Sequence, residues 1–97
     1  MDEQLIKIVS DARDPSTPDN TFTKLYTEYK QVRDVVVSRK IQGNILKSID
    51  NAVISLSYLV RDLKQITNEG DLEIAATATK KIVDDCYSKL VFLKSMC

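Results

Sequence analysis

The placement of glycine and proline is the strongest constraint on how this chain can fold. Both prolines fall within one stretch, DPSTPDN at residues 14–20, and the only glycines are Gly43 and Gly70. The long segments between these breakers contain nothing that would interrupt a regular helical backbone. The sequence therefore predicts an all-α protein.

Apolar residues in these segments recur at the three- and four-residue spacing of amphipathic helices. We expect a short helix at residues 2–13 and longer helices at about 21–41, 45–67 and 72–95. Asp71 is the expected N-cap of the last helix, because its side chain can accept hydrogen bonds from the first backbone N–H groups. The expected core stripes run from Leu5 to Ala12, Phe22 to Val36, Ile45 to Ile66, and Leu72 to Leu93.

The apolar stripe changes sides near Gly43. At about 100° per residue, the stripe before Gly43 centres near 10° and the one after it near 200°, measured from Val36. One straight helix would turn these stripes to opposite sides. Because glycine readily takes the left-handed conformation that ends helices, we expect a reversal there, with Arg39 and Lys40 in the last helical turn. A second reversal at residues 68–71 gives an antiparallel, up-down-up three-helix core.

Length and charge limit the class of protein. A chain of 97 residues that starts with Met1 is expected to form a single domain, residues 1–97. Its longest apolar run, LVFL, is too short to cross a bilayer, so we expect a soluble, cytoplasmic protein with no membrane partner. Lys plus Arg equals Asp plus Glu, at 14 each, which favours association over attraction to polyanions.

The composition offers little catalytic chemistry. The chain has no histidine, which is the commonest general base and metal ligand. Cys86 and Cys97 would lie about 16 Å apart on one helix, beyond disulfide reach, and no pair of cysteines has metal-site spacing. Cys86 is expected in the core and Cys97 as a free thiol. We therefore expect no enzymatic activity, cofactor, metal or small-molecule substrate.

One enzyme class works without histidine or metal. The run SIDNAVISLSYLVR, residues 48–61, resembles the opening helix of the all-helical chorismate mutases over about a dozen residues. This resemblance would imply a small helical enzyme that binds a dicarboxylate through Arg, Lys and Glu or Gln. The run lies in the middle of the chain, however, and the further spaced Arg and Lys residues of that family are absent. We keep this activity as a second alternative.

Charge alternates along the chain, from acidic to basic to acidic to basic. The first basic segment could form a strip for nucleic acid, which makes nucleic-acid binding the first alternative function. Segments of alternating sign are also expected of antiparallel neighbours in one bundle, and we favour that interpretation. The candidate nucleic-acid-binding residues are Lys30, Arg33, Arg39 and Lys40.

Two apolar residues of the 45–67 helix lie outside its stripe. Ile54 and Tyr58 are i, i+4 neighbours about 160° or more from the stripe centre, and Lys47 and Arg61 share their side. Tyr and Arg are over-represented at interface hot spots, so this side is a candidate partner-binding surface. Alternatively, the N-terminal helix covers it within the same chain and completes a four-helix bundle.

Further apolar residues lie out of phase near the ends of two helices. Val35 and Val37 are expected in the core, because a middle helix with two neighbours needs a wide buried stripe. Val91, Phe92 and Met96 are expected on a surface for self-association or a partner, because little chain remains to cover them. The sequence thus predicts a non-enzymatic interaction module, a small adaptor, regulator or assembly subunit, that binds another protein or forms a homo-oligomer.

Overall fold

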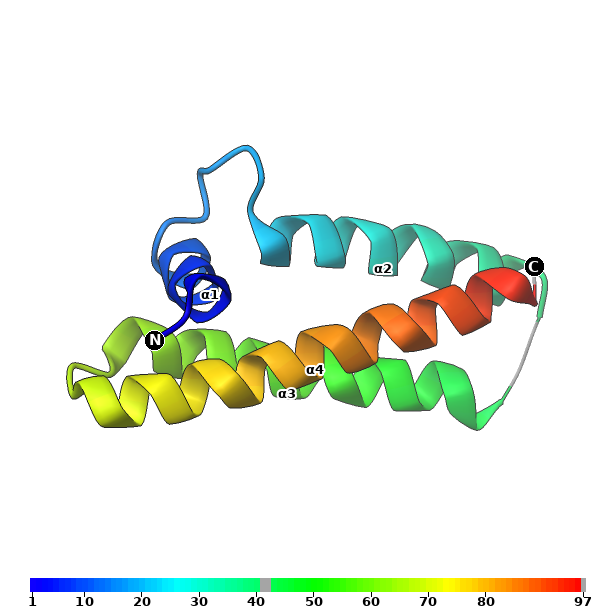
Figure 1. Cartoon of the computed structure of the whole chain (residues 1–97). Coiled ribbons are helices and arrows are strands. Elements are labelled where there is room, and N and C mark those ends of the chain that lie inside the picture. The colour runs from blue at the N-terminus through cyan, green and yellow to red at the C-terminus, as the bar shows by residue number, and fades with distance from the viewer. Residues whose placement is uncertain (41–42, 97) are drawn as a thin grey trace.

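The computed structural model describes residues 1–40 and 43–96, and these residues form four helices (Figure 1). The helices are α1 (Glu3–Arg13), α2 (Thr21–Ser38), α3 (Asn44–Gln65) and α4 (Glu69–Ser95). α2, α3 and α4 run up, down and up, so the predicted all-α helical bundle is confirmed. The long helices α3 and α4 form a pair, and the other two helices pack on it.

The helices form two layers. α3 and α4 pack side by side along most of their length, and α1 and α2 lie on the same side of this pair. α1 is seen nearly end-on in Figure 1, so it crosses the pair steeply, whereas α2 lies mainly along α4. The reversal between α2 and α3 is as predicted, but among the described residues these two helices touch only marginally. The main neighbour of α2 is α4.

The core forms where the two layers meet. Burying a large aliphatic side chain contributes about 1.5–3 kcal/mol, so this shared core supplies most of the driving force for packing. The predicted stripes supply it, together with Ala76 and Thr79 of α4, whose burial was not expected. The largest side chains with almost no exposed surface are Leu25, Val36, Ile49, Leu56, Leu63, Leu90 and Leu93.

The predicted burial of Val35 and Val37 is wrong. These side chains of α2 are 40% and 51% exposed. The prediction assumed that α2 is a middle helix with two neighbours, but α2 packs mainly on α4 and needs only a narrow stripe. Tyr26 and Tyr29 are half-buried, and their hydroxyl groups form hydrogen bonds with Ser57 and Asp50 of α3.

The break between α2 and α3 differs in detail from the prediction. α2 ends at Ser38, so Arg39 is its C-cap and Lys40 follows the helix instead of lying in its last turn. Lys40 takes the left-handed conformation, with φ of 56°, and Gly43 has φ of 156° just before α3. The predicted final residue of α2, Ile41, lies outside the described residues.

The start of α4 also corrects the prediction. Asn68, not Asp71, is the N-cap, and its side-chain oxygen accepts a hydrogen bond from the Asp71 N–H at 3.1 Å. Asn and Asp cap helices about equally well, so the earlier of the two begins the helix. Gly70 therefore lies inside the first turn.

Side chains also hold α1 and the loop after it in place. Asn20 is buried and caps α2 by accepting hydrogen bonds from Phe22 N–H and Thr23 N–H. Its amide group donates to the backbone oxygens of Asp11, at 2.8 Å, and Asp14, at 3.1 Å. One side chain therefore closes the proline-containing loop from both sides.

Arg13 connects the end of α1 to the end of α3. Its guanidinium donates to the backbone oxygen of Leu63 at 3.0 Å and to that of Ile66 at 2.7 Å. The last carbonyl groups of a helix have no partner within the helix, and a cation there also suits the helix dipole. α1 is therefore an integral part of the bundle.

Candidate interaction surface

Within the part of the chain that the structure describes, one side of the α3–α4 pair has no covering layer. Asp50 and Ser57 of α3 point toward α2, where they meet Tyr29 and Tyr26. The residues that follow them, Asn51 and Tyr58, point about 100° away. On α4, Lys94 pairs with Glu28 of α2, whereas Phe92 lies about 160° around the helix from Lys94.

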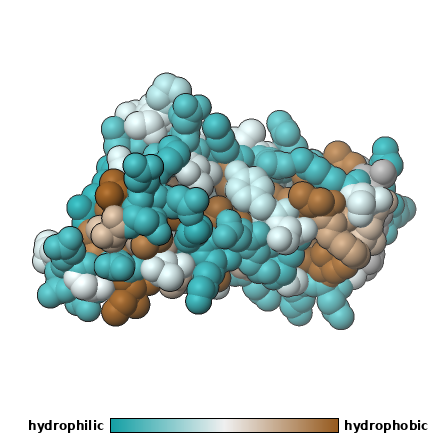
Figure 2. All heavy atoms as spheres, viewed as in Figure 1, coloured by the Kyte–Doolittle hydropathy of each residue, from teal (hydrophilic) through white to brown (hydrophobic). Residues whose placement is uncertain are grey.

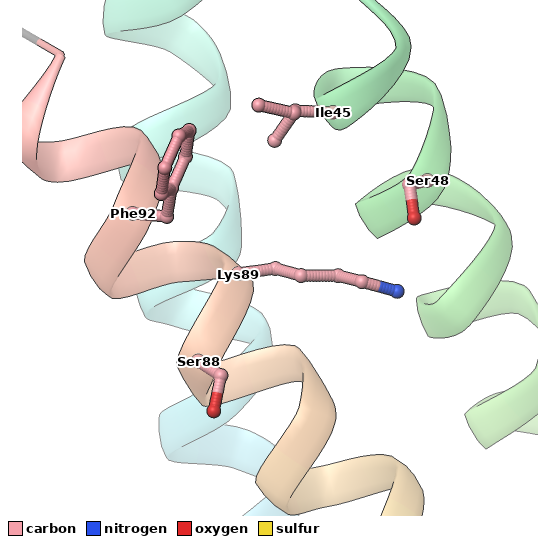
Figure 3. A pocket seen from close by; sticks show the side chains of 5 residues that line it. All are labelled: Ile45, Ser48, Ser88, Lys89 and Phe92. Carbon is pink, nitrogen blue, oxygen red and sulfur yellow. The ribbon is translucent and has the colours of Figure 1, made fainter.

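We call this uncovered side the open face. In Figure 3, which looks onto part of it, α2 passes behind α4. The following residues define it, all of them exposed: Lys47, Asn51, Tyr58 and Asp62 of α3, and Ile74, Lys81, Asp85, Ser88 and Phe92 of α4.

Large apolar side chains stand on or beside the open face. Tyr58 is 64% exposed, Ile74 71% and Phe92 53%, and Ile54 on the outward edge of α3 is 54% exposed. α1 does not cover Ile54 and Tyr58, because its apolar stripe from Leu5 to Ala12 is buried in the core at the end of the bundle. The alternative in which the N-terminal helix hides this pair is therefore wrong.

A groove lies where α3 begins and α4 ends. It has a volume of about 300 Å³ and is lined by Ile45, Ser48, Ser88, Lys89 and Phe92. Figure 3 shows the Phe92 ring and Ile45 on opposite walls, while the Lys89 side chain stretches from α4 toward α3. In Figure 2, apolar side chains gather at this same end of the molecule. The small serine side chains leave the space that the groove occupies.

Two further hollows extend along the open face. One of about 400 Å³ shares Ser48 and Lys89 with the groove and continues to Ser55 and Ile82. The other, of about 600 Å³, lies along the first part of α4 beside Ile74 and Lys81. The open face is thus uneven along its whole length, with Phe92 and Ile74 near its ends and Tyr58 among polar residues between them.

The charges on this face are exposed. Lys89 donates to Asp85 at 2.7 Å, an i, i+4 pair on the surface of α4. Exposed pairs of this kind contribute about 0–1 kcal/mol, so they do little to hold the fold. Lys47, Arg61 and Lys81 are also exposed. Their charges are available to a partner.

The predicted C-terminal surface is divided by the structure. Phe92 lines the groove, and Met96, which is 44% exposed, lies at the end of the bundle beside Val36 and Leu93. Val91 is exposed but precedes Phe92 and points about 100° away from it. Val91 therefore lies apart, whereas Phe92 and Met96 are i, i+4 neighbours that both lie beside Ile45, and of the three only Phe92 is on the open face.

The predicted basic strip is not formed. Arg33 is paired with Asp50 of α3 at 3.3 Å. Lys30 and Arg39 are nine residues apart and so project from opposite sides of α2, and Lys40 lies beyond the helix. The candidate nucleic-acid-binding residues do not share one surface.

Ile74 is the large apolar residue of the open face that sequence reasoning missed. It sits 18 residues before Phe92, which is five full turns of an α-helix, so both project from the same side of α4. That spacing was the available signal. It was overlooked because Ile74 adjoins the buried Leu72 and Ala76 and was not separated from the core stripe.

Within residues 1–40 and 43–96, no three His, Cys, Asp or Glu side chains are placed to hold a metal ion. Cys86 is buried as predicted, and burial together with the nearby Asp85 raises its pKa to about 11. Cys97 lies outside the described residues.

Comparison with known proteins gives no further identification. No protein-family model, no curated protein and no solved structure matches this chain.

Across the described helices, none combines the length and apolar character needed to cross a membrane.

Proposed function

We propose that this protein is a non-enzymatic interaction module, a small adaptor, regulator or assembly subunit, that binds another protein surface through the open face. The observation that carries the proposal is the set of large apolar residues that stand more than half exposed on or beside this face. Several large apolar side chains exposed on one face of a small protein are typical of protein-binding sites.

The free energy that these apolar side chains can contribute is consistent with binding. Removing the exposed part of such a side chain from water contributes about 1–2 kcal/mol. Four residues, Ile54, Tyr58, Ile74 and Phe92, then contribute about 4–8 kcal/mol, compared with about 8 kcal/mol for micromolar affinity. Because association also costs entropy, the polar middle of the face must take part as well. The interface therefore covers most of the open face.

The two alternative functions have less support. Nucleic-acid binding needs a shared basic surface, and Arg33 is already paired with Asp50. An activity like that of the chorismate mutases needs several cations around one enclosed dicarboxylate site. Arg61, the cation of the run that resembles those enzymes, is exposed on the outer side of α3.

A site-specific photo-crosslinker tests the proposal. Benzoyl-phenylalanine placed at Ser88, inside the groove, should form covalent adducts in the cells that make the protein. The matched control is the same probe at Gln31, which is exposed on α2. The adducts should disappear when Tyr58→Ala is added, and their mass identifies the bound protein. No adducts at Ser88, or equal adducts at Ser88 and Gln31, would contradict the proposal.

A further inference from the structure

The residues of the open face are arranged about a midpoint. On α3, Lys47 and Asp62 lie at equal distances on either side of residues 54–55. On α4, Lys81 and Asp85 lie on either side of residue 83, as do Ile74 and Phe92. Each of these charged residues thus has a counterpart of opposite sign across the midpoint, Ile74 and Phe92 are apolar counterparts, and Tyr58 is matched by Asn51.

The two midpoints coincide in space. Ser55 and Ile82 line the same hollow between α3 and α4, and Ile45 and Phe92 face each other further along the antiparallel pair. A residue of α3 and a residue of α4 whose numbers sum to about 137 therefore lie side by side, at the same position along the helix pair. By this rule the midpoint of α3 lies beside the midpoint of α4.

We infer that the open face binds a second copy of this chain in antiparallel orientation. This inference rests on the proposed function and specifies its partner. A two-fold axis crosses both helices at the shared midpoint, so that each helix lies against the same helix of the second copy. Phe92 then meets Ile74 of the second copy, Asp85 meets Lys81, and Lys47 meets Asp62. Each contact occurs twice, as a two-fold interface requires.

Charge complementarity selects this orientation. Lys47 and Lys89 stand near one end of the open face, and Asp62 and Asp71 near the other. Parallel copies would place like charges against each other, which is unfavourable, whereas antiparallel copies pair the basic end with the acidic end. The chain is neutral overall, so no net repulsion opposes the association.

The dimensions favour a second copy over a single helix. α3 has 22 residues, which corresponds to about 33 Å, and two adjacent helices are about 20 Å wide, so the face projects to about 660 Å². A stable interface buries about 800 Å² per partner. Only an occupant that covers nearly the whole uneven face reaches this area. One helix would cover half of its width, while a second α3–α4 pair matches it in both directions.

Charge exchange between Lys47 and Asp62 tests the inference. Lys47→Glu should weaken self-association about tenfold, because two like-charge contacts arise in each dimer, and Asp62→Lys should do the same. The double variant, Lys47→Glu with Asp62→Lys, should restore the dimer. Within one chain these residues are 15 positions apart, or about 22 Å along α3, so restoration arises only between chains.

Mixing the two single variants gives the sharpest result. Each should be largely monomeric alone, and together they should form a one-to-one heterodimer, measured by sedimentation equilibrium. Lys30→Glu on α2 is the matched control and should leave the dimer unchanged. Circular dichroism confirms that each variant keeps its helices.

Two outcomes would overturn the inference. One is a parent chain that stays monomeric up to about 1 mM, which corresponds to less than about 4 kcal/mol of binding. The other is a dimer that ignores both charge reversals. In either case, crosslinks from Ser88 to a different protein would leave the proposed function standing, and the absence of all Ser88 adducts would remove both.

Discussion

The two ends of the bundle differ in how the ends of their helices are capped. Where α1 lies against the bundle, side chains form hydrogen bonds with the backbone groups at helix ends. At the opposite end, the N-cap of α3 is Gly43, which has no side chain to bind the first N–H groups of that helix. At the α1 end, Asn20 caps α2 and Arg13 caps the end of α3. At the opposite end, Lys40 is left-handed and Phe92 is half exposed beside an apolar groove.

This difference shows how one small fold separates two tasks. Caps and buried hydrogen bonds satisfy polar backbone groups and fix the position of a helix. An end with fewer such ties can keep apolar side chains exposed, because their burial is left to a partner. The contacts that hold α1 therefore contribute mainly to stability, whereas we place binding on the open face, which extends from the groove at the opposite end to Ile74.

The largest expected effect comes from Asn20→Ala at the α1 end. This change removes the cap of α2 and leaves the backbone oxygens of Asp11 and Asp14 without their Asn20 donor, which should lower the free energy of unfolding by about 3 kcal/mol. Urea denaturation followed by circular dichroism measures it. Asn51→Ala, on the exposed open face, should stay within about 0.5 kcal/mol of the parent chain. Equal effects of the two changes would contradict the comparison.

Arg13→Ala should cost about 2 kcal/mol, because two charge-assisted hydrogen bonds to the end of α3 are lost. Hydrogen exchange should show the effect locally, with faster exchange in α1 and in the last turn of α3. Arg61→Ala removes an exposed arginine of α3 and serves as the matched control, with little change expected. If both arginine variants unfold at the same urea concentration, α1 is not held by Arg13.

At the opposite end, Lys40→Gly should stabilise the fold by about 1 kcal/mol. A residue other than glycine in the left-handed conformation is strained, and glycine removes that strain at some cost in unfolded-chain entropy. Arg39→Gly is the matched control, because Arg39 has a φ of −86° and gains nothing from glycine. Stabilisation by both changes, or by neither, would show that the conformation of Lys40 costs nothing.

The helices themselves follow from the sequence, because they depend on local pattern. Few breakers, a regular apolar spacing and the change of side near Gly43 are enough to give four helices in the observed order. The neighbour of each helix does not follow in the same way. The stripe of α2 shows which side is buried, but not that α4 lies against it, and this is why Val35 and Val37 were misplaced.

The site was partly predictable for the same reason. Tyr58 and Ile54 were found because they stand alone on the far side of a clean stripe. Ile74 was recoverable from its 18-residue spacing to Phe92, but it adjoins buried neighbours. The contacts of Asn20 and Arg13 depend on chain segments that meet only in the folded protein, so no local sequence pattern predicts them.

The smallest expected effect concerns acid and the α1 end. Burial opposes the charged form of Asp11, but hydrogen bonds from Thr21 and the nearby Lys7 outweigh it and hold the pKa of Asp11 below its ordinary value of 3.8. The charged form is thus favoured by folding, so its contribution is complete above that value and is lost as pH falls through the lower folded pKa.

The corresponding variant is Asp11→Asn. It should be less stable than the parent chain at neutral pH by about 1 kcal/mol or less, and the difference should shrink as the pH falls below 3.8. Thr21→Val, which removes one donor to the carboxylate, should show part of the same pH dependence. Thermal unfolding across this pH range measures both variants. A constant difference at all pH values would mean that the Asp11 charge does not help to hold α1 against α2, and that the α1 end owes its stability to Asn20 and Arg13 instead.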